Sequence, residues 1–510
     1  MPHAPSSRPR RPLAWAAPFV VAAACADAPT TPALAPRDAP SANATADYAQ
    51  TLGFRRAVTV DRVRAHQAAL QAIADANGGT RVAGTAGGDA SEAYVHARLA
   101  AAGYAPSYQS FSFTFTGDRT PPVLQRISPP AATYAPGVDF ATMTGSGSGD
   151  VTAPVYAVQL DFTPPIDPSM IGCAAGDFAG FPPGAIALLQ RNGCTFALMA
   201  QNAQAAGAAG VIIFNEGNTP DRLGVVTGTL GPAPGVTIPV VGATFALGQS
   251  FALPVTNGPT GVVARLRVDF VSSETRTGRN VIAEAPGGDP ARVIVVASAV
   301  DGDARGPAIN ATSGAAAALA IAEAYAGQDR TSTNRVRFVF FSGYAEGNLG
   351  TTHYLNALAP SDRARIAAVV GSEVLGSPNF GRFVLDATTA PAGSAAIRDL
   401  LTEYFGQAGL ASRTLSPPTG SFGGSVLTPF ALAGIPAGGL YAGTIEPKTA
   451  EQAALFGGTA GIAFDPCYRL ACDTFANVSP SGLDQMTDAT AHAVLLLSRR
   501  NLLKEPLAAP

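Results

Sequence analysis

The chain has 510 residues, of which 47% are hydrophobic and 14% are charged. This is enough apolar sequence for two or three domains with large buried cores, so a mostly disordered chain is excluded. The formal net charge of -3 offers no basic surface to a phosphate backbone, and we expect no nucleic-acid partner.

The first residues have the pattern of an export signal. Arginines precede an apolar run over residues 13–24, which is too short to cross a bilayer comfortably. Small residues then precede Cys25, as at the site where bacterial lipoproteins receive their lipid. We expect residues 1–25 to be a lipoprotein-type signal peptide, with lipidation of Cys25 as the only membrane attachment, and residues 26–50 to be a flexible linker. Ordinary cleavage after a small-residue site, with release of the protein, is the alternative.

The other four cysteines form two pairs that are close in sequence, Cys173 with Cys194 and Cys467 with Cys472. In an oxidising compartment such pairs are typical of disulfides. A four-cysteine zinc site is the alternative, but neither pair has the two-residue spacing that such sites favour. We therefore predict two disulfides.

Residues 51–145 begin the globular part. Apolar residues recur at helical spacing over 63–74 and 90–102, with Gly78 and Gly79 as breakers between them. Alternating residues over 108–115 follow, so two helices and then a strand are predicted.

Residues 146–269 differ in character. A strand over 186–189, a helix over 196–206 and a strand over 211–214 form a compact α+β unit. This segment resembles a protease-associated domain, which implies an accessory domain that restricts or presents substrate to a peptidase. The resemblance is carried by Gly172-Cys173, Asp177-Phe178-Ala179-Gly180, residues 186–196, residues 202–217 and Thr237-Ile238-Pro239-Val240-Val241.

From residue 292 onward, strands and helices alternate, as in a mostly parallel sheet. Function gathers at the carboxyl ends of the strands of such sheets. Strands are predicted over 293–297, 336–341 and 366–370, and helices over 313–326 and 351–358. The polar residues that follow the three strands are Asp301, Asp303, Asn310, Tyr344, Glu346 and Glu373.

This part of the chain is similar to metallopeptidase family twenty-eight, the di-zinc aminopeptidases, and to its secreted bacterial members above all. The similarity implies a three-layer α/β fold with a central mixed, mostly parallel sheet, in which the insert splits one peptidase domain into residues 51–145 and 270–502. It is carried by residues 434–440, 448–461, 465–468 and 471–474, and upstream by His66 and Asn77-Gly78-Gly79-Thr80-Arg81.

The resemblance also implies where a metal centre would lie. In the family, five side chains hold two zinc ions and a glutamate takes a proton from the shared water. The position of that base is Tyr344 here, and of the ligand positions only Glu373 keeps a group that can bind metal. Alanine has no lone pair and arginine stays protonated, so we expect no bound zinc and no retained catalytic residue. The five ligand positions are Ala299, Ala311, Ala345, Glu373 and Arg469.

We therefore expect an exported, monomeric and catalytically inactive relative that binds peptides or another protein of the cell envelope. The alternative is an active metallo-aminopeptidase that releases N-terminal amino acids and takes its metal ligands from Asp301, Asp303, Glu346 or His353. A serine hydrolase is disfavoured because the chain has no G-x-S-x-G motif.

Two further predictions concern charged residues of this region. We expect Arg469 to form a salt bridge with Glu373, Asp301 or both, with the ring of Tyr344 covering the pocket. Asp484 and Asp488 lie four residues apart on the predicted last helix and are weak candidates for calcium. Two solvated carboxylates near the start of a helix are the alternative.

Overall fold

The computed structural model describes residues 42–167, 171–231, 235–327, 332–416, 424–502 and 504–507. The predicted signal peptide and Cys25 lie outside these residues. Within them, no helix combines the length and the hydropathy that crossing a bilayer requires.

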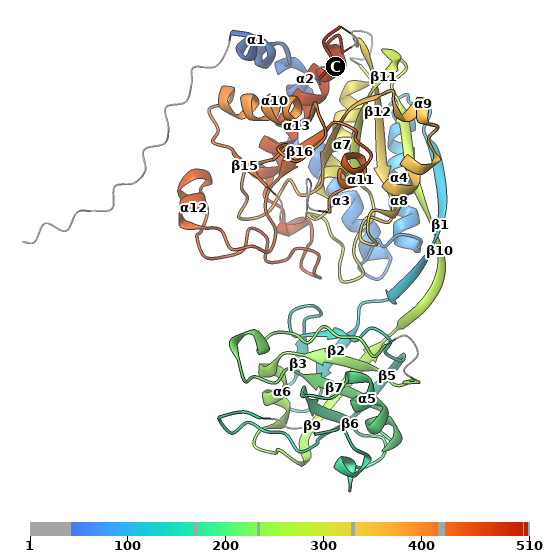
Figure 1. The fold of residues 1–510 in the computed structure, drawn as a ribbon, viewed down its shortest axis with the longest axis vertical. Coiled ribbons are helices and arrows are strands. Elements are labelled where there is room, and N and C mark those ends of the chain that lie inside the picture. Colours follow the sequence, from blue (N-terminus) through green and yellow to red (C-terminus); the bar gives the residue numbers. More distant parts are fainter. Residues whose placement is uncertain are drawn as a thin grey trace, which may run out of the picture. The chain divides into compact units, whose positions relative to one another are not determined.

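Eight strands form the first sheet, in the order β1-β10-β12-β11-β13-β16-β14-β15 (Figure 1). The central strands β12, β11, β13 and β16 run parallel, whereas β1, β10 and β14 pair antiparallel with their neighbours toward the centre. The predicted mixed, mostly parallel sheet is thus confirmed. The strands are β1 (Ser107–Asp118), β10 (Phe270–Glu284), β11 (Asp289–Ala299), β12 (Asn334–Phe341), β13 (Ile366–Ser372), β14 (Phe383–Leu385), β15 (Arg413–Leu415) and β16 (Ala437–Tyr441).

Helices cover both faces of this sheet and make it the middle of three layers. Alternate residues of β11 point to opposite faces, so Ile294 and Val296 join one apolar core while Val295 and Ala297 join another. The first core contains residues of α3 (Val60–Ala76), α4 (Ala86–Ala101), α7 (Ser313–Tyr325), α10 (Ser394–Gln407) and α13 (Pro480–Arg499). The second contains residues of α8 (Leu349–Ala357) and α11 (Thr428–Leu432). Three short helices also belong to this part: α2 (Leu52–Ala57), α9 (Pro360–Arg363) and α12 (Ala450–Phe456).

The two helices predicted near the start are α3 and α4, and side-chain caps explain where they begin. Thr59 accepts a hydrogen bond from the backbone of Arg62, and Thr85 accepts one from Gly88. Gly78 and Gly79, which follow α3, both have positive φ, the conformation that glycine adopts at low cost.

A helix that the sequence did not indicate, α1 (Ala42–Gln50), occupies the end of the expected linker. The ring of Tyr48 lies 5.6 Å from that of Tyr404 on α10, and the guanidinium of Arg55 lies 4.2 Å from the centre of the Tyr48 ring. The prediction of a flexible linker is therefore wrong for residues 42–50, because aromatic packing against a distant helix holds them.

Eight further strands form a second sheet, in the order β3-β2-β9-β5-β6-β7-β8-β4. The predicted strand, helix, strand unit is confirmed as β6, α5 and β7, with both strands fully buried. β2, β3 and β4 lie before residue 146, so this sheet begins earlier in the chain than the change in composition suggests. The elements are β2 (Val123–Arg126), β3 (Ala132–Tyr134), β4 (Phe140–Thr142), β5 (Gly149–Ala157), β6 (Ile186–Gln190), α5 (Phe196–Ala205), β7 (Gly210–Phe214), β8 (Val240–Ala243), α6 (Phe245–Ala252) and β9 (Gly258–Val268).

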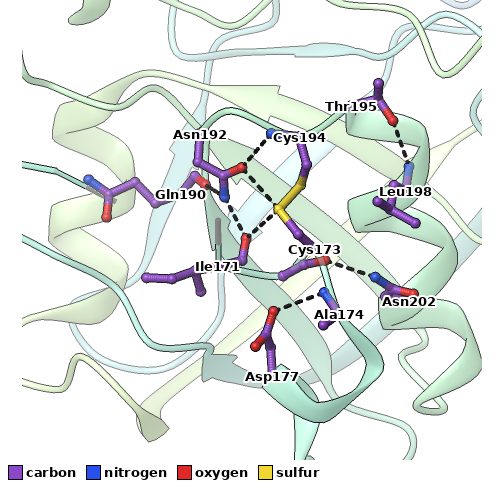
Figure 2. Close-up of a disulfide and its surroundings, with 11 residues drawn as sticks. Ile171, Cys173, Ala174, Asp177, Gln190, Asn192, Cys194, Thr195, Leu198 and Asn202 are labelled. Atoms are coloured by element: carbon purple, nitrogen blue, oxygen red, sulfur yellow. Dashed lines mark hydrogen bonds between the residues drawn. A yellow bond between two sulfur atoms is a disulfide. The ribbon is translucent and has the colours of Figure 1, made fainter. Parts of the chain in front are cut away.

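Both predicted disulfides are present, Cys173 with Cys194 and Cys467 with Cys472. Figure 2 shows the first of them beside Asn192, whose side chain accepts a hydrogen bond from the Cys194 backbone and donates one to the carbonyl of Ile171. Disulfides persist in oxidising compartments, which is what the predicted export requires.

Candidate active site

The loops after β11, β12 and β13 bring together three of the predicted polar residues, Asp301, Tyr344 and Glu373. The backbone N–H of Tyr344 donates to Oδ1 of Asp301 at 3.2 Å. Burial, the charge of Glu373 and the nearby Tyr468 raise the pKa of Tyr344 well above its ordinary value, so its phenol is neutral. The expectation that function gathers at the carboxyl ends of these strands thus identifies one cluster of side chains.

Asp301, which is buried, and Glu346, which is partly buried, are two carboxyl groups of this cluster whose charges interact. Burial raises the pKa of Asp301 to about 7, and burial together with the charge of Asp301 raises that of Glu346 to about 8. Among the described residues, Oδ2 of Asp301 and Oε2 of Glu346 have no hydrogen-bond partner although both atoms are buried. Two carboxyl oxygens are therefore available to take or give a proton near neutral pH.

Glu373 is the third buried carboxyl of the site. Its Oε1 accepts a hydrogen bond from the backbone N–H of Val426. Burial raises its pKa to about 7, although the bonds from Val426 and Tyr344 and the charge of Arg469 oppose this rise.

Arg81, on the loop between α3 and α4, forms hydrogen bonds with the loop that contains Asp301, and it was not assigned a role from sequence. Its guanidinium is fully buried and donates to the carbonyls of Val300 at 2.7 Å and Pro307 at 3.1 Å, and to the hydroxyl of Thr312 at 2.8 Å. Burial lowers its pKa to about 10, while the charge of Asp301 acts in the opposite direction. The arginine remains charged at neutral pH and compensates the nearby carboxylate. The sequence signal for this role was the position of Arg81 shortly after Gly78 and Gly79.

The sequence led us to expect a salt bridge from Arg469 to Glu373, Asp301 or both. Among the described residues, Arg469 pairs with neither of them. In the described part of the chain, the carboxylate within ion-pair distance of its guanidinium is Asp303, with Nε and Oδ2 3.7 Å apart. The backbone of Arg469 has a φ of 58°, and its N–H donates to Asp473 at 3.1 Å. The guanidinium of Arg469 lies 4.9 Å from the centre of the Tyr344 ring.

Asp473 and Asn310 tie the loops around the cluster together. Asp473 accepts hydrogen bonds from the backbones of Asn310 at 2.7 Å and Ala311 at 3.2 Å. The side chain of Asn310 donates to Asp465 at 2.6 Å and accepts from the backbone of Gly376 at 3.1 Å. The two alanines at expected ligand positions, Ala299 and Ala311, are fully buried, and Ala299 belongs to the second apolar core.

All four histidines among the described residues have partners outside this cluster. His66 contacts Tyr94 and Glu323, and His492 contacts Thr51. The rings of His96 and His353 lie against Tyr108 and Phe111. His353, one of the alternative ligands considered from sequence, is therefore not part of the site.

Of the two calcium candidates on α13, Asp488 lies beside a cation of the protein. Oδ2 of Asp488 lies 3.6 Å from Nη1 of Arg55 and accepts a bond from the hydroxyl of Tyr404 at 3.4 Å. Burial raises the pKa of Asp488 to about 6 and also raises that of Asp484. Neither carboxylate belongs to a metal-binding group in the described part of the chain.

Comparison with known proteins identifies both parts of the chain. Residues 280–494 match the model of peptidase family M28, and residues 151–251 match that of the PA domain. An aminopeptidase of Pseudomonas aeruginosa is 39% identical over 88% of this chain and 82% of its own length. A probable lipoprotein aminopeptidase of Mycobacterium tuberculosis is 32% identical over 89% of this chain and 88% of its own. A probable leucine aminopeptidase 2 of Aspergillus fumigatus is 36% identical over 70% of this chain and 68% of its own.

Solved structures share the fold at lower identity. An aminopeptidase from Aneurinibacillus has a TM-score of 0.53 at 22% identity and covers 90% of this chain and 97% of its own. A zinc aminopeptidase from Bacillus subtilis has a TM-score of 0.54 at 20% identity and covers 88% of this chain and 98% of its own.

These relatives overturn the expectation of a catalytically inactive binding protein. They are aminopeptidases, they align with nearly the whole chain, and they favour the alternative of an active enzyme. The expectation was drawn from the family's ligand positions, and Glu346 is not one of them. Glu346, set aside because it would need a loop shift, lies close enough to Asp301 for their charges to interact.

The zinc that the fold family implies does not fit the described donors. A catalytic zinc ion needs about three protein ligands. Across the residues with described positions, no three histidine, cysteine, aspartate or glutamate side chains are grouped so that they could hold a metal ion. Asp303, the remaining carboxylate near Glu346, already receives two hydrogen bonds from Arg305.

Proposed function

Because the chain belongs to peptidase family M28, we propose that it is an aminopeptidase, which hydrolyses the first peptide bond of peptide substrates. The observation that carries this proposal is the 39% identity to the Pseudomonas aminopeptidase over 88% of the chain, a match too long to be explained by the insert alone. The cluster after β11, β12 and β13 is the site that we assign to this activity.

The chemistry of the cluster supports hydrolysis through proton transfer by carboxyl groups. A general base or acid works best when its pKa lies near the operating pH. Asp301 and Glu346 meet this condition, with pKa values raised to about 7 and about 8. In our proposal, the ionised member of the pair takes a proton from the attacking water and its protonated neighbour gives one to the leaving amine. The same carboxylates attract the ammonium group of a peptide N-terminus.

The proposal is tested by assaying L-leucyl-p-nitroanilide, a substrate suggested by the leucine aminopeptidase among the relatives. Glu346→Gln and Asp301→Asn keep the size of each side chain but remove its titration, and we expect kcat/KM to fall by about 10² to 10⁴. Glu403→Gln is the matched control, because Glu403 is exposed on α10, and its turnover should equal that of the wild type. The assay is run with a chelator and with added zinc. Absence of turnover in both conditions would refute the aminopeptidase assignment.

We also propose that the enzyme is exported and anchored through a lipid on Cys25. The two disulfides and the resemblance to a probable lipoprotein aminopeptidase support this localisation. The wild-type protein should partition into the detergent phase, and Cys25→Ala should release the protein or block its processing. Recovery of the wild type in the aqueous phase would contradict anchoring.

A further inference from the structure

We propose that Arg469 binds the carbonyl oxygen of the first residue of the substrate, so that its guanidinium polarises the bond that is cleaved. This inference rests on the proposed function, because it assigns a role within the same site. For this residue, the sequence suggested only a structural salt bridge.

The guanidinium of Arg469 is held in place but its donors are not used. Its ion pair with Asp303 is long, at 3.7 Å, and among the described residues none of its side-chain N–H groups donates a hydrogen bond to a protein acceptor. Arg305, by contrast, donates two bonds to the same Asp303, at 2.9 and 3.2 Å. An arginine has five N–H donors in a fixed plane, so Arg469 keeps donors available for a ligand.

Three features fix the position of this side chain. Its backbone has a φ of 58°, and its N–H is bound to Asp473 at 3.1 Å. The disulfide between Cys467 and Cys472 closes the loop around it. The rings of Tyr344 and Tyr468 lie 4.9 and 5.8 Å from the guanidinium carbon. Little ordering is therefore needed when a ligand binds, which favours affinity.

The site around Arg469 contains charges of both signs. The side chain of Arg469 is 22% exposed, and the carboxylate of Asp303 lies 3.7 Å from its Nε. An amino acid residue at a peptide N-terminus has a cationic amine next to a carbonyl oxygen. A carboxylate would attract the amine while the guanidinium donates to the carbonyl oxygen, and donors at that oxygen stabilise the negative charge that develops there.

The test measures binding of three small probes by calorimetry, independently of turnover. L-leucine and L-leucinamide contain a carbonyl oxygen next to the amine, whereas L-leucinol has a hydroxyl group in place of that carbonyl. For the wild type we expect leucinamide and leucine to bind about 10 to 100 times more tightly than leucinol, as for a hydrogen bond to a charged donor. Arg469→Met should remove most of this difference, and Arg469→Lys should keep part of it because lysine retains the charge without the planar fork.

Arg305→Met is the matched control, since it removes another arginine from Asp303 and its side chain is 41% exposed. It should keep the preference of the wild type. Equal binding of leucinol and leucinamide to the wild type, an unchanged preference in Arg469→Met, or no binding of any probe would overturn the inference. If Arg469→Met fails to fold, the ratio of the leucinamide affinity to the leucinol affinity in Arg469→Lys tests the inference instead. Carbonyl-dependent binding without turnover would refute the proposed function and leave the role of Arg469 in binding intact.

Discussion

Arg81 shows how one buried side chain can hold a whole site in shape. It bonds to Val300, Pro307 and Thr312, which lie at both ends of the loop that contains Asp301. A buried guanidinium is costly unless its donors are satisfied and its charge is compensated, and here both conditions are met. The same residue thus provides hydrogen bonds to the backbone and a charge opposite the carboxylate.

We predict that Arg81→Met lowers the free energy of unfolding by roughly 3–5 kcal/mol, because it leaves buried acceptors and Asp301 without their partner. Arg81→Lys should recover little, since an ammonium group cannot reach three separated acceptors at once. Urea denaturation followed by circular dichroism measures the change. A loss below about 1 kcal/mol for Arg81→Met would show that the loop is held by other contacts.

The carboxyl pair predicts how stability changes with pH. A carboxyl group with a raised pKa binds its proton more tightly in the folded chain than in the unfolded chain, where its pKa is near 4. Between that value and the folded values of about 7 for Asp301 and about 8 for Glu346, the folded state holds more protons. The free energy of unfolding should therefore fall as the pH rises from 5 to 8.

Glu346→Gln should reduce this fall by on the order of 2 kcal/mol, because the glutamine does not ionise. The residual dependence comes from other buried carboxyls such as Asp473, whose pKa burial also raises to about 7. Urea midpoints at pH 5 and pH 8 provide the measurement, with Glu403→Gln as the exposed control. An equal fall in the variant and the wild type would contradict the raised pKa of Glu346.

At the scale of elements, the site depends on how closely α7 approaches the end of β13. Gly314, the second residue of α7, donates its N–H to the carbonyl of Glu373 at 2.7 Å. A Cβ atom at this position would lie 1.9 Å from the carbonyl oxygen of Ser372. The contact excludes any side chain at residue 314, and it positions the backbone from which Glu373 projects.

Gly314→Ala should therefore separate α7 from β13, destabilise the protein by about 1–3 kcal/mol and reduce turnover. Gly406→Ala is the matched control, because a Cβ atom added to Gly406 in α10 would have no other atom within 4 Å. That substitution should stabilise the protein by up to about 1 kcal/mol. Thermal unfolding and the nitroanilide assay report the two effects. Unchanged stability of Gly314→Ala would mean that the helix can shift without cost.

At the scale of the whole molecule, the chain builds two sheets with separate apolar cores. The cores that pack on the first sheet contain no residue from 119–269, and the buried residues in the cores of the second sheet all lie between 124 and 268. The ends of the second part meet, since the N–H of Arg119 donates to the carbonyl of Asp269 at 2.8 Å. Because these ends lie together, β1 pairs with β10 up to the point where the insert leaves the first sheet, at Asp118 and Phe270.

We predict that residues 119–269, produced alone and oxidised, fold with a cooperative thermal transition. The fragment keeps its own cores and its disulfide between Cys173 and Cys194, which closes a loop of about 20 residues and contributes about 3 kcal/mol in the loop-entropy model. Dispersed amide signals in a proton–nitrogen spectrum would support this. A spectrum typical of a molten chain would show that the second sheet depends on the rest of the protein.

Local patterns in the sequence were enough to predict several elements of the fold. Helical spacing predicted α3 and α4, short apolar runs predicted β6, β7, β11, β12 and β13, and the spacing of the cysteines predicted both disulfides. The sequence also placed Asp301, Tyr344 and Glu373 together, because the ends of adjacent parallel strands must meet at one edge of a sheet. Motif resemblance identified the family that the relatives confirm.

The interactions between side chains of different loops could not be predicted from these local patterns. A salt bridge depends on the course of two loops that are distant in sequence, so the sequence suggested Glu373 and Asp301 as partners of Arg469, whereas the structure pairs it with Asp303. For the same reason Glu346 was set aside as a group in the site, and α1 was taken for a linker although Tyr404 packs against it. Local spacing determines which elements form, whereas the contacts between loops also depend on residues that are distant in sequence.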